Sequence, residues 1–475
     1  MQLETPPLFA HQESAVQFLK EHNGCGMIAH EPGLGKTRTA LTAYKAYKET
    51  DTLLGLLVIA PLSLLEAAWH EDIKRFAPDL SFWNLHKEGL HNIPYANVYA
   101  VNYELFQRPE KIAVLATYMR TRTFMAVLDE SSKIKNHSSL TTKHLLAIRS
   151  FFSKRIVMSG TPAPNDESEY WAQMEFVRPG ILSKSFNQFR RTYFHLEGRN
   201  GVPINTQGMI MTKQVMQDLY QKQGAQFAIT SESRAKLFQV IGPMIHAAKK
   251  DECLDLPEQV DEIRLVQMGP RQRAAYNQMK RHLVAEIEGQ DVVAQVALSK
   301  LMKLRELSSG FAISENNEIV ETECPKLTEL EQILDELGDR QAIIWGNFTY
   351  EIQKIYRMLD MRKAFCATTL YGNTADREDS INGFIEGRYK YLVANPHSAA
   401  HGLTFVNCSH QIFFSLDYSW EAYEQARART HRAGQKSTCV YYYILADGTI
   451  DQEILGVLKK KGDMQELVFK LRDKK

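Results

Sequence analysis

Several features that mark other classes of protein are missing from this sequence. Its 6 cysteines never form a Cys-x-x-Cys pair, so neither a zinc ribbon nor a disulfide framework is indicated, and a reducing compartment fits. No apolar run approaches the roughly 20 residues that a membrane-spanning helix needs. No basic-then-apolar leader opens the sequence. We therefore expect a cytoplasmic protein without a membrane partner.

An excess of charge of either sign is also missing. Lys and Arg number 57 and Asp and Glu 56, which leaves a net charge of +1. Because no global basic field is present, a nucleic-acid partner would have to be bound by local patches. A hydrophobic fraction of 44% and a length of 475 residues indicate a globular protein with two or more domains.

The stretch HEPGLGKT, residues 30–37, nearly matches a phosphate-binding loop, although histidine replaces the usual first glycine. A short apolar run precedes it and a helix-like stretch follows, which is the setting that such a loop needs. Gly33 and Gly35 would let the backbone approach phosphate oxygens. Lys36 would neutralise the β- and γ-phosphates, and the Thr37 hydroxyl would hold Mg²⁺. A helix N-terminus with a surface lysine is the plainer alternative.

The stretch FMAVLDE, residues 124–130, is an unbroken apolar run that ends in two carboxylates. Such runs predict central parallel strands, and ligands bind at the carboxyl ends of these strands. Asp129 would hold Mg²⁺, and Glu130 would orient and deprotonate the attacking water. The alternative is that both acids only mark the exposed end of a strand.

Strand-like and helix-like stretches alternate along the chain in two series, which predicts two lobes with parallel α/β sheets. The expected strands cover residues 53–61, 98–106, 124–129 and 155–162 in the first series and 342–348, 365–372, 389–396, 410–417 and 439–445 in the second. Amphipathic helices lie between the two series. We place the first lobe at 1–245, an inter-lobe strand and helical insertion at 246–335, and the second lobe at 336–475.

The stretch YEQARARTHRAGQ, residues 423–435, is helix-like up to Gly434 and rich in arginine. Arg429 and Arg432 are three positions apart, so on a helix they share a face. Two arginines that reach a γ-phosphate would stabilise the charge that develops in the transition state. A basic surface helix that contacts DNA phosphates is the alternative.

The order and spacing of these motifs resemble the Swi/Snf-type ATPases of helicase superfamily two, which are double-stranded DNA translocases, over nearly the whole chain. The resemblance implies two tandem RecA-like α/β lobes with a helical insertion between them. It also implies ATP and Mg²⁺ as cofactors, and duplex or branched DNA as a partner bound without sequence preference. This family tolerates a non-glycine residue at the start of the phosphate loop. The compact form looks more like its bacterial and phage members.

The family's motifs assign roles to further residues. Gln12, in LFAHQESAVQFL, would read adenine, and Gly402, in SAAHGLTF, would belong to the nucleotide site. Gln425 would join Glu130 and the two arginines in the catalytic set. The residues expected to contact DNA or couple hydrolysis to its movement are Ser63, Trp69, Ser159, Thr161 and Gln435.

Departures from the family pattern leave questions open. Ser132 stands where a histidine commonly links the nucleotide site to the third motif, which puts the strength of coupling in doubt. His397 and His401 have the spacing of two metal ligands but lack an acidic partner.

A DNA motor in repair, recombination, replication or remodelling of protein–DNA complexes is the favoured function. A strand-separating DNA or RNA helicase and a non-catalytic DNA-binding module are the alternatives. Any nuclease or other effector would lie on a separate chain, since no residues here resemble a nuclease centre.

Overall fold

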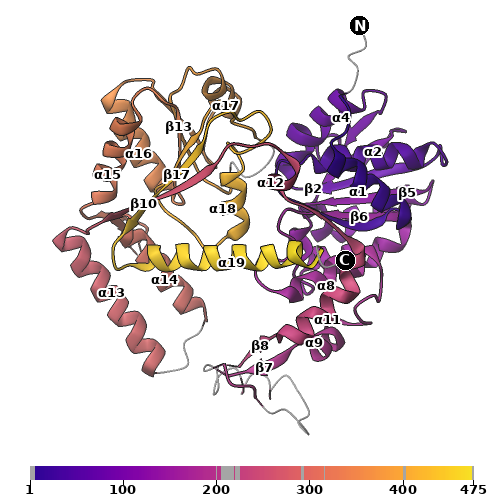
Figure 1. Cartoon of the computed structure of the whole chain (residues 1–475), viewed down its shortest axis with the longest axis horizontal. Coiled ribbons are helices and arrows are strands. Elements are labelled where there is room, and N and C mark those ends of the chain that lie inside the picture. Colours follow the sequence, from indigo (N-terminus) through magenta and orange to yellow (C-terminus); the bar gives the residue numbers. More distant parts are fainter. Residues whose placement is uncertain are drawn as a thin grey trace. The chain divides into compact units, whose positions relative to one another are not determined.

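The computed structural model describes residues 6–198, 201–204, 215, 219, 225–289, 294–314, 316–398 and 403–472. The chain divides into two compact units: the first comprises the residues up to Cys253 together with those from Met464 onward, and the second comprises Leu254–Asp463. Each unit is built on its own parallel sheet, so the predicted fold class is confirmed (Figure 1). The domain limits at residues 245 and 335 stay predictions. No helix in the described ranges is long and apolar enough to cross a membrane.

The first unit contains a 7-stranded sheet in the order β3-β4-β2-β5-β6-β1-β9, with every neighbouring pair parallel. Its strands are β1 (Cys25–His30), β2 (Gly55–Ala60), β3 (Phe82–Asn84), β4 (Val98–Asn102), β5 (Phe124–Asp129), β6 (Phe152–Met158) and β9 (Ile245–Ala248). Its helices include α1 (Ala10–Glu21), α2 (Lys36–Lys48), α3 (Leu62–Leu64), α4 (Glu71–Phe76), α5 (Leu85–Glu88), α6 (Pro109–Met119), α7 (Leu140–Ile148), α8 (Tyr170–Val177), α9 (Phe186–Tyr193), α11 (Ser231–Ile241) and α12 (Lys250–Cys253). A short antiparallel pair, β7 (His195–Glu197) with β8 (Gln226–Ala228), lies outside the main sheet.

Both faces of this sheet are buried, which explains the unbroken apolar runs. In β2, Leu56 and Val58 pack in one hydrophobic cluster together with residues of α1 and α2. The alternating residues Leu57 and Ile59 pack in a second cluster with residues of α6, α7 and α8. Because successive side chains of a strand point to opposite faces, a strand covered on both faces has to be apolar throughout. Burying each such side chain stabilises the fold by about 1.5–3 kcal/mol.

The second unit contains a 6-stranded parallel sheet in the order β10-β17-β16-β13-β15-β14. Its strands are β10 (Gln259–Val266), β13 (Ala342–Trp345), β14 (Ala367–Leu370), β15 (Tyr391–Ala394), β16 (His410–Phe413) and β17 (Cys439–Ala446). Its helices are α13 (Pro270–Gly289), α14 (Ala294–Ser308), α15 (Pro325–Leu337), α16 (Thr349–Arg362), α17 (Arg377–Ile385), α18 (Trp420–Arg427) and the part of α19 (Ile450–Arg472) up to Asp463. An antiparallel pair joins β11 (Phe311–Ile313) to β12 (Ile319–Glu321). Strand β10 comes from the predicted inter-lobe segment and pairs with β17 from Gln259 to Val266.

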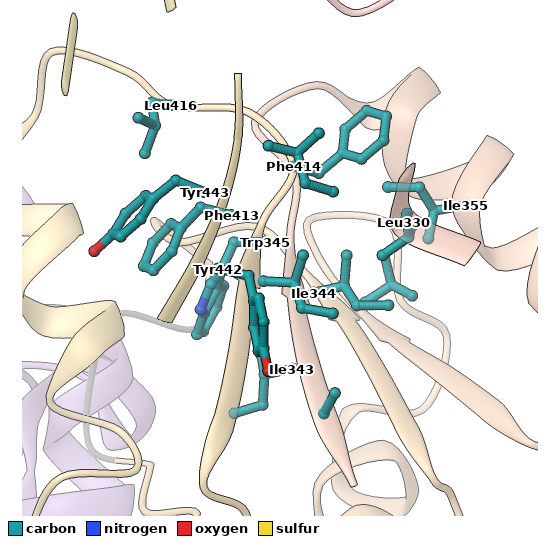
Figure 2. Packing of buried hydrophobic residues seen from close by; sticks show 14 of the residues in the cluster. Leu330, Ile343, Ile344, Trp345, Ile355, Phe413, Phe414, Leu416, Tyr442 and Tyr443 are labelled. Atoms are coloured by element: carbon teal, nitrogen blue, oxygen red, sulfur yellow. The ribbon is translucent and has the colours of Figure 1, made fainter. Parts of the chain in front are cut away.

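Aromatic side chains fill the centre of the second unit. Figure 2 shows Phe413 and Tyr443 stacked face to face, and their ring centroids are 5.1 Å apart. Trp345 is fully buried, and its Nε1 donates to Gln411 Oε1 at 2.8 Å. The tyrosines of β17 therefore serve packing within the sheet, where aromatic residues are favoured.

Candidate active site

Three neighbouring strands of the first unit, β5, β6 and β1, end side by side. Met158 at the end of β6 pairs with Ile28 on one side and with Asp129 on the other. The loops that follow these strands carry the phosphate-loop motif, the two carboxylates and the Ser-Gly-Thr motif. The structure thus brings three motifs to one edge of the sheet, the edge where parallel α/β sheets bind ligands.

The phosphate loop has the backbone geometry of an anion cradle. Gly33 and Gly35 have φ angles of 97° and 70°, values that glycine adopts without steric cost. A Cβ atom at Gly35 would lie 2.4 Å from Gln12 Nε2, so any larger residue would have to displace that amide. No described side chain caps the N-terminus of α2, which leaves its first amides to meet an anion. Lys36 Nζ donates to the His30 carbonyl at 2.9 Å, which holds the cation beside the loop.

Gln12 of α1 lies against this loop. Its Nε2 donates to the carbonyls of Leu34 and Gly35 at 3.3 and 3.4 Å, and its Oε1 accepts from the amide of Phe9 at 3.1 Å. The side chain is 2% exposed. The arrangement ties α1 to the phosphate loop, while the reading of adenine by Gln12 stays a prediction.

Asp129 is held rigidly at the end of β5. Its Oδ2 accepts from Trp69 Nε1 at 2.9 Å, and its Oδ1 accepts from the amide of Glu130 at 3.1 Å. Tyr103 donates to the main-chain carbonyl of Asp129 at 2.8 Å. Burial raises the pKa of Asp129, whereas the nearby Lys36 cation and the Trp69 bond lower it. Trp69 is fully buried, so of its two expected roles the geometry favours coupling over direct DNA contact.

The residues at this edge fit a magnesium ion. Asp129 supplies a buried carboxylate, and Thr37 supplies a hydroxyl in the first turn of α2. Hard oxygen ligands of these two kinds suit Mg²⁺, which usually keeps several waters and binds only one or two carboxylates. Lys36 opposes the effect of burial on Asp129, which favours the charged form that a metal needs.

Glu130 has an unusual backbone conformation. Its φ and ψ angles are 52° and 57°, in the left-handed region. For a residue with a Cβ atom this region costs about 1–2 kcal/mol, and such strain persists mainly at functional sites. The conformation interrupts the strand right after Asp129 and is the structural feature that distinguishes Glu130 from an ordinary strand-end carboxylate.

The loop after β6 contacts the phosphate loop. Ser159 is fully buried, its amide donates to the Ile28 carbonyl at 3.2 Å, and its Oγ accepts from the amide of Thr161 at 3.1 Å. A Cβ atom at Gly160 would lie 2.8 Å from the Cδ of Pro32. Because the two loops are in contact at this point, a displacement of one loop would displace the other.

His30 occupies the first position of the phosphate loop as a buried, neutral base. Its Nε2 lies 2.9 Å from Nδ1 of His246, whose Nε2 lies 3.0 Å from Ser14 Oγ. Burial lowers the pKa of His30 well below its usual value, and His246 and Lys36 lower it further. The loop therefore accommodates histidine through a contact with β9. No local pattern could indicate this contact, because His30 and His246 are 216 positions apart.

The two arginines of the second unit converge without sharing a helix. We expected a helix up to Gly434, but the helix ends at Arg427. There, Gln411 Nε2 donates to the Arg427 carbonyl at 3.1 Å. Arg429 Nη1 and Arg432 Nη1 nevertheless donate to the same carbonyl, that of Leu403, at 2.8 and 3.0 Å. A turn thus produces the convergence that we expected from a helix face.

The remaining predicted residues lie in diverse settings. Gln435 Nε2 donates to three carbonyls, of Val406 at 3.3 Å, Cys408 at 2.9 Å and Thr430 at 3.2 Å, which fixes the loop around the arginines. Gln425 is buried in α18, and Ser63 is exposed in α3, right after β2. Gly402 and His401 lie outside the described residues. His397 lies 2.7 Å from Asp417, and no group of three metal-binding side chains occurs among the described residues.

A phosphate-loop motif and a buried carboxylate follow strands of one parallel sheet, and two arginines converge in the other unit, as expected for the helicase-type ATPases that the motifs resemble. The chain belongs to the SNF2-related family. The model of the SNF2-related domain matches residues 11–310, and that of the helicase conserved C-terminal domain matches residues 325–434. The family that the motifs predicted is confirmed.

The relatives include both compact and longer proteins. The chain is 25% identical to an uncharacterised ATP-dependent helicase of Mycoplasma pneumoniae, with 97% of this chain and 42% of that protein covered. It is 22% identical to the protein p41 of Acyrthosiphon pisum secondary endosymbiont phage 1, with 93% and 94% covered. It is 24% identical to the human DNA repair and recombination protein RAD54B, with 94% and 53% covered. The chain thus spans about half or less of two of these relatives.

Proposed function

We propose that this protein is an ATP-driven motor that hydrolyses ATP in a DNA-stimulated manner and moves on duplex or branched DNA. The observation that carries the proposal is the meeting of the phosphate loop, the Asp129–Glu130 pair and the Ser159–Thr161 loop at three neighbouring strand ends. The similarity to a DNA repair and recombination protein supports DNA as the partner.

Each loop has a distinct task in the proposed hydrolysis. The amides around Gly33 and Gly35, together with Lys36, hold the phosphates of ATP. Thr37 and Asp129 would hold Mg²⁺, which when bound neutralises charge on the phosphates. Glu130 orients the attacking water and accepts its proton.

The second unit completes the reaction in this proposal. Arg429 and Arg432 reach the γ-phosphate when the units close, together with Gln425, and stabilise the charge of the transition state. The site would be complete only when the units are closed, in one state of the ATP cycle. Repeated closing and opening would then make the protein bind DNA tightly and loosely in turn, which moves it along the DNA. Recognition would rest on phosphate contacts and would ignore sequence.

The biological process and the compartment are inferred from the relatives alone. Repair, recombination, replication or remodelling of protein–DNA complexes in the cytoplasm of a bacterium or a phage-infected cell fits the phage and bacterial relatives. A separate effector or nuclease chain is a compatible partner and is testable by co-purification.

The proposed function is tested by ATP turnover in the presence of duplex, forked, gapped and single-stranded DNA and of RNA. We expect duplex or branched DNA to raise turnover and the effect to fall steeply with salt, because phosphate contacts release counterions. Turnover that is the same with every nucleic acid and without any would contradict the motor. A strand-displacement assay on forked DNA separates translocation from strand separation, and absence of phosphate release would identify a DNA-binding module.

Replacing Arg429 by alanine is expected to leave ATP binding intact and to lower turnover by about 10²- to 10³-fold, the usual cost of removing one donor to transition-state charge. The comparison is Arg388→Ala, which removes an exposed arginine of the same unit from its pairs with Asp379 and Glu386. Full turnover in Arg429→Ala would remove this arginine from catalysis. Turnover is measured by phosphate release, and ATP binding is measured with a fluorescent ATP analogue.

A further inference from the structure

A buried side chain from α8 joins the loop after β5 to the loop after β6. Ser131 and Gln173 are both fully buried, and Ser131 Oγ donates to Gln173 Oε1 at 2.7 Å. Ser131 follows Glu130 directly and precedes Ser132, the position that departs from the family pattern. The acidic loop therefore has a polar connection through the neighbour of the residue that departs.

The other end of the Gln173 amide reaches the Ser-Gly-Thr loop. Its Nε2 donates to the Pro162 carbonyl at 2.6 Å and to the Glu169 carbonyl at 3.0 Å. The reversed amide would place its oxygen against both carbonyls, so these bonds fix the orientation of the side chain. Pro162 follows Thr161, one of the residues that we expect to couple hydrolysis to movement. One side chain thus spans from the acidic loop to the coupling loop.

A second connection between the same loops lies nearer to solvent. Lys135 Nζ lies 3.5 Å from Glu169 Oε1, which also accepts from Asn165 Nδ2 at 2.6 Å. The Lys135 side chain is 31% exposed, so water and salt weaken its pairing. The bonds of Gln173 are fully shielded, and leaving buried polar partners unsatisfied is costly. Gln173 is therefore the stronger mechanical link of the two.

We propose that Gln173 is a positioning residue that transmits the nucleotide state from the loop of Glu130 to the loop of Thr161. Ser131 is adjacent to Glu130 in the chain, so a shift of the acidic loop on ATP binding carries its hydroxyl along. The close-packed surroundings and the two-ended amide pass this shift to the Pro162 carbonyl. Gln173 thereby joins the acidic loop, through Ser131, to the loop that follows β6. The role deepens the proposed motor function and rests on it.

The test measures backbone amide hydrogen exchange with and without a non-hydrolysable ATP analogue and Mg²⁺. In the unchanged protein, the analogue is expected to slow exchange both in residues 33–39 and in residues 159–166. In Gln173→Leu, residues 33–39 should keep their protection. Residues 159–166 should lose about two- to tenfold of theirs, the factor that corresponds to the net strength of one hydrogen bond.

The matched control is Gln272→Leu in the second unit. Gln272 is 1% exposed, and its Nε2 also donates to two carbonyls, those of Leu307 at 2.8 Å and Ser308 at 3.2 Å. This substitution removes a comparable buried amide, so it should lower the melting temperature similarly and leave the protection of residues 159–166 intact. If Gln173→Leu does not fold, Ser131→Ala, which leaves Gln173 its bonds to Pro162 and Glu169, is expected to cause the same loss.

Two results would overturn the role of Gln173. One is unchanged protection of residues 159–166 in the folded variant, and the other is an unchanged protein in which the analogue protects residues 33–39 alone. Neither readout involves DNA. If DNA does not stimulate ATP turnover, the proposed motor function is contradicted. That result is distinguishable from a loss of the proposed role of Gln173, which is read by hydrogen exchange without DNA.

Discussion

Replacing Glu130 by glutamine is expected to stop ATP turnover while leaving ATP bound. The amide keeps the size of the side chain and cannot accept the proton of the attacking water. Loss of general-base catalysis typically costs about 10²- to 10⁴-fold in rate. Glutamine meets the same left-handed backbone as glutamate, with φ at 52°, so the local strain should be unchanged. The variant should therefore be folded and trapped in its ATP-bound state.

This expectation is checked by single-turnover phosphate release together with binding of a fluorescent ATP analogue. Glu110→Gln serves as the control, because it makes the same chemical change on an exposed position of α6. A Glu130→Gln protein that releases phosphate within tenfold of the unchanged rate would assign the base to another group. Loss of analogue binding would instead give Glu130 a part in holding the nucleotide.

Most strands could be predicted from the sequence because both faces of the central strands are buried. Residues 124–128 and 439–445 are apolar without interruption, and they form most of β5 and most of β17. The phosphate loop and the acidic pair were visible for the same reason, since each directly follows such a run. The end of the helix in the arginine stretch could not be predicted, because it falls where Gln411, 16 positions earlier in the chain, donates to the carbonyl of Arg427.

The contacts that orient the site could not be predicted. Tyr103 and Trp69 lie 26 and 60 positions from Asp129, and Gln173 lies 42 positions from Ser131. No local pattern marks a side chain whose partner is brought near only by sheet order. Trp69 was found through a family motif, and its bond to Asp129 was not. No sequence pattern marked Gln173, because a single glutamine within a helix is an ordinary residue with no motif around it.

Replacing Lys36 by alanine is expected to abolish both tight ATP binding and turnover. The cation is held at the loop by the His30 carbonyl, 2.9 Å away, and it also lowers the pKa of buried Asp129. Its loss removes a charge that faces the phosphates, which typically costs about 10²- to 10³-fold in rate. The pKa of Asp129 should then rise further, since burial is less opposed, and this disfavours the charged form that Mg²⁺ requires.

The matched control for Lys36→Ala is Lys48→Ala, which removes a lysine from the last turn of the same helix. The two variants lose the same charge, so any difference between them reports position rather than net charge. Analogue binding and phosphate release should both fail in Lys36→Ala and both persist in Lys48→Ala. Because Glu130→Gln should keep binding while Lys36→Ala loses it, the pair separates holding the nucleotide from breaking it. Nucleotide affinity in Lys36→Ala equal to that of the control would mean that the phosphates lie elsewhere, and the loop after β1 would lose its place in the site.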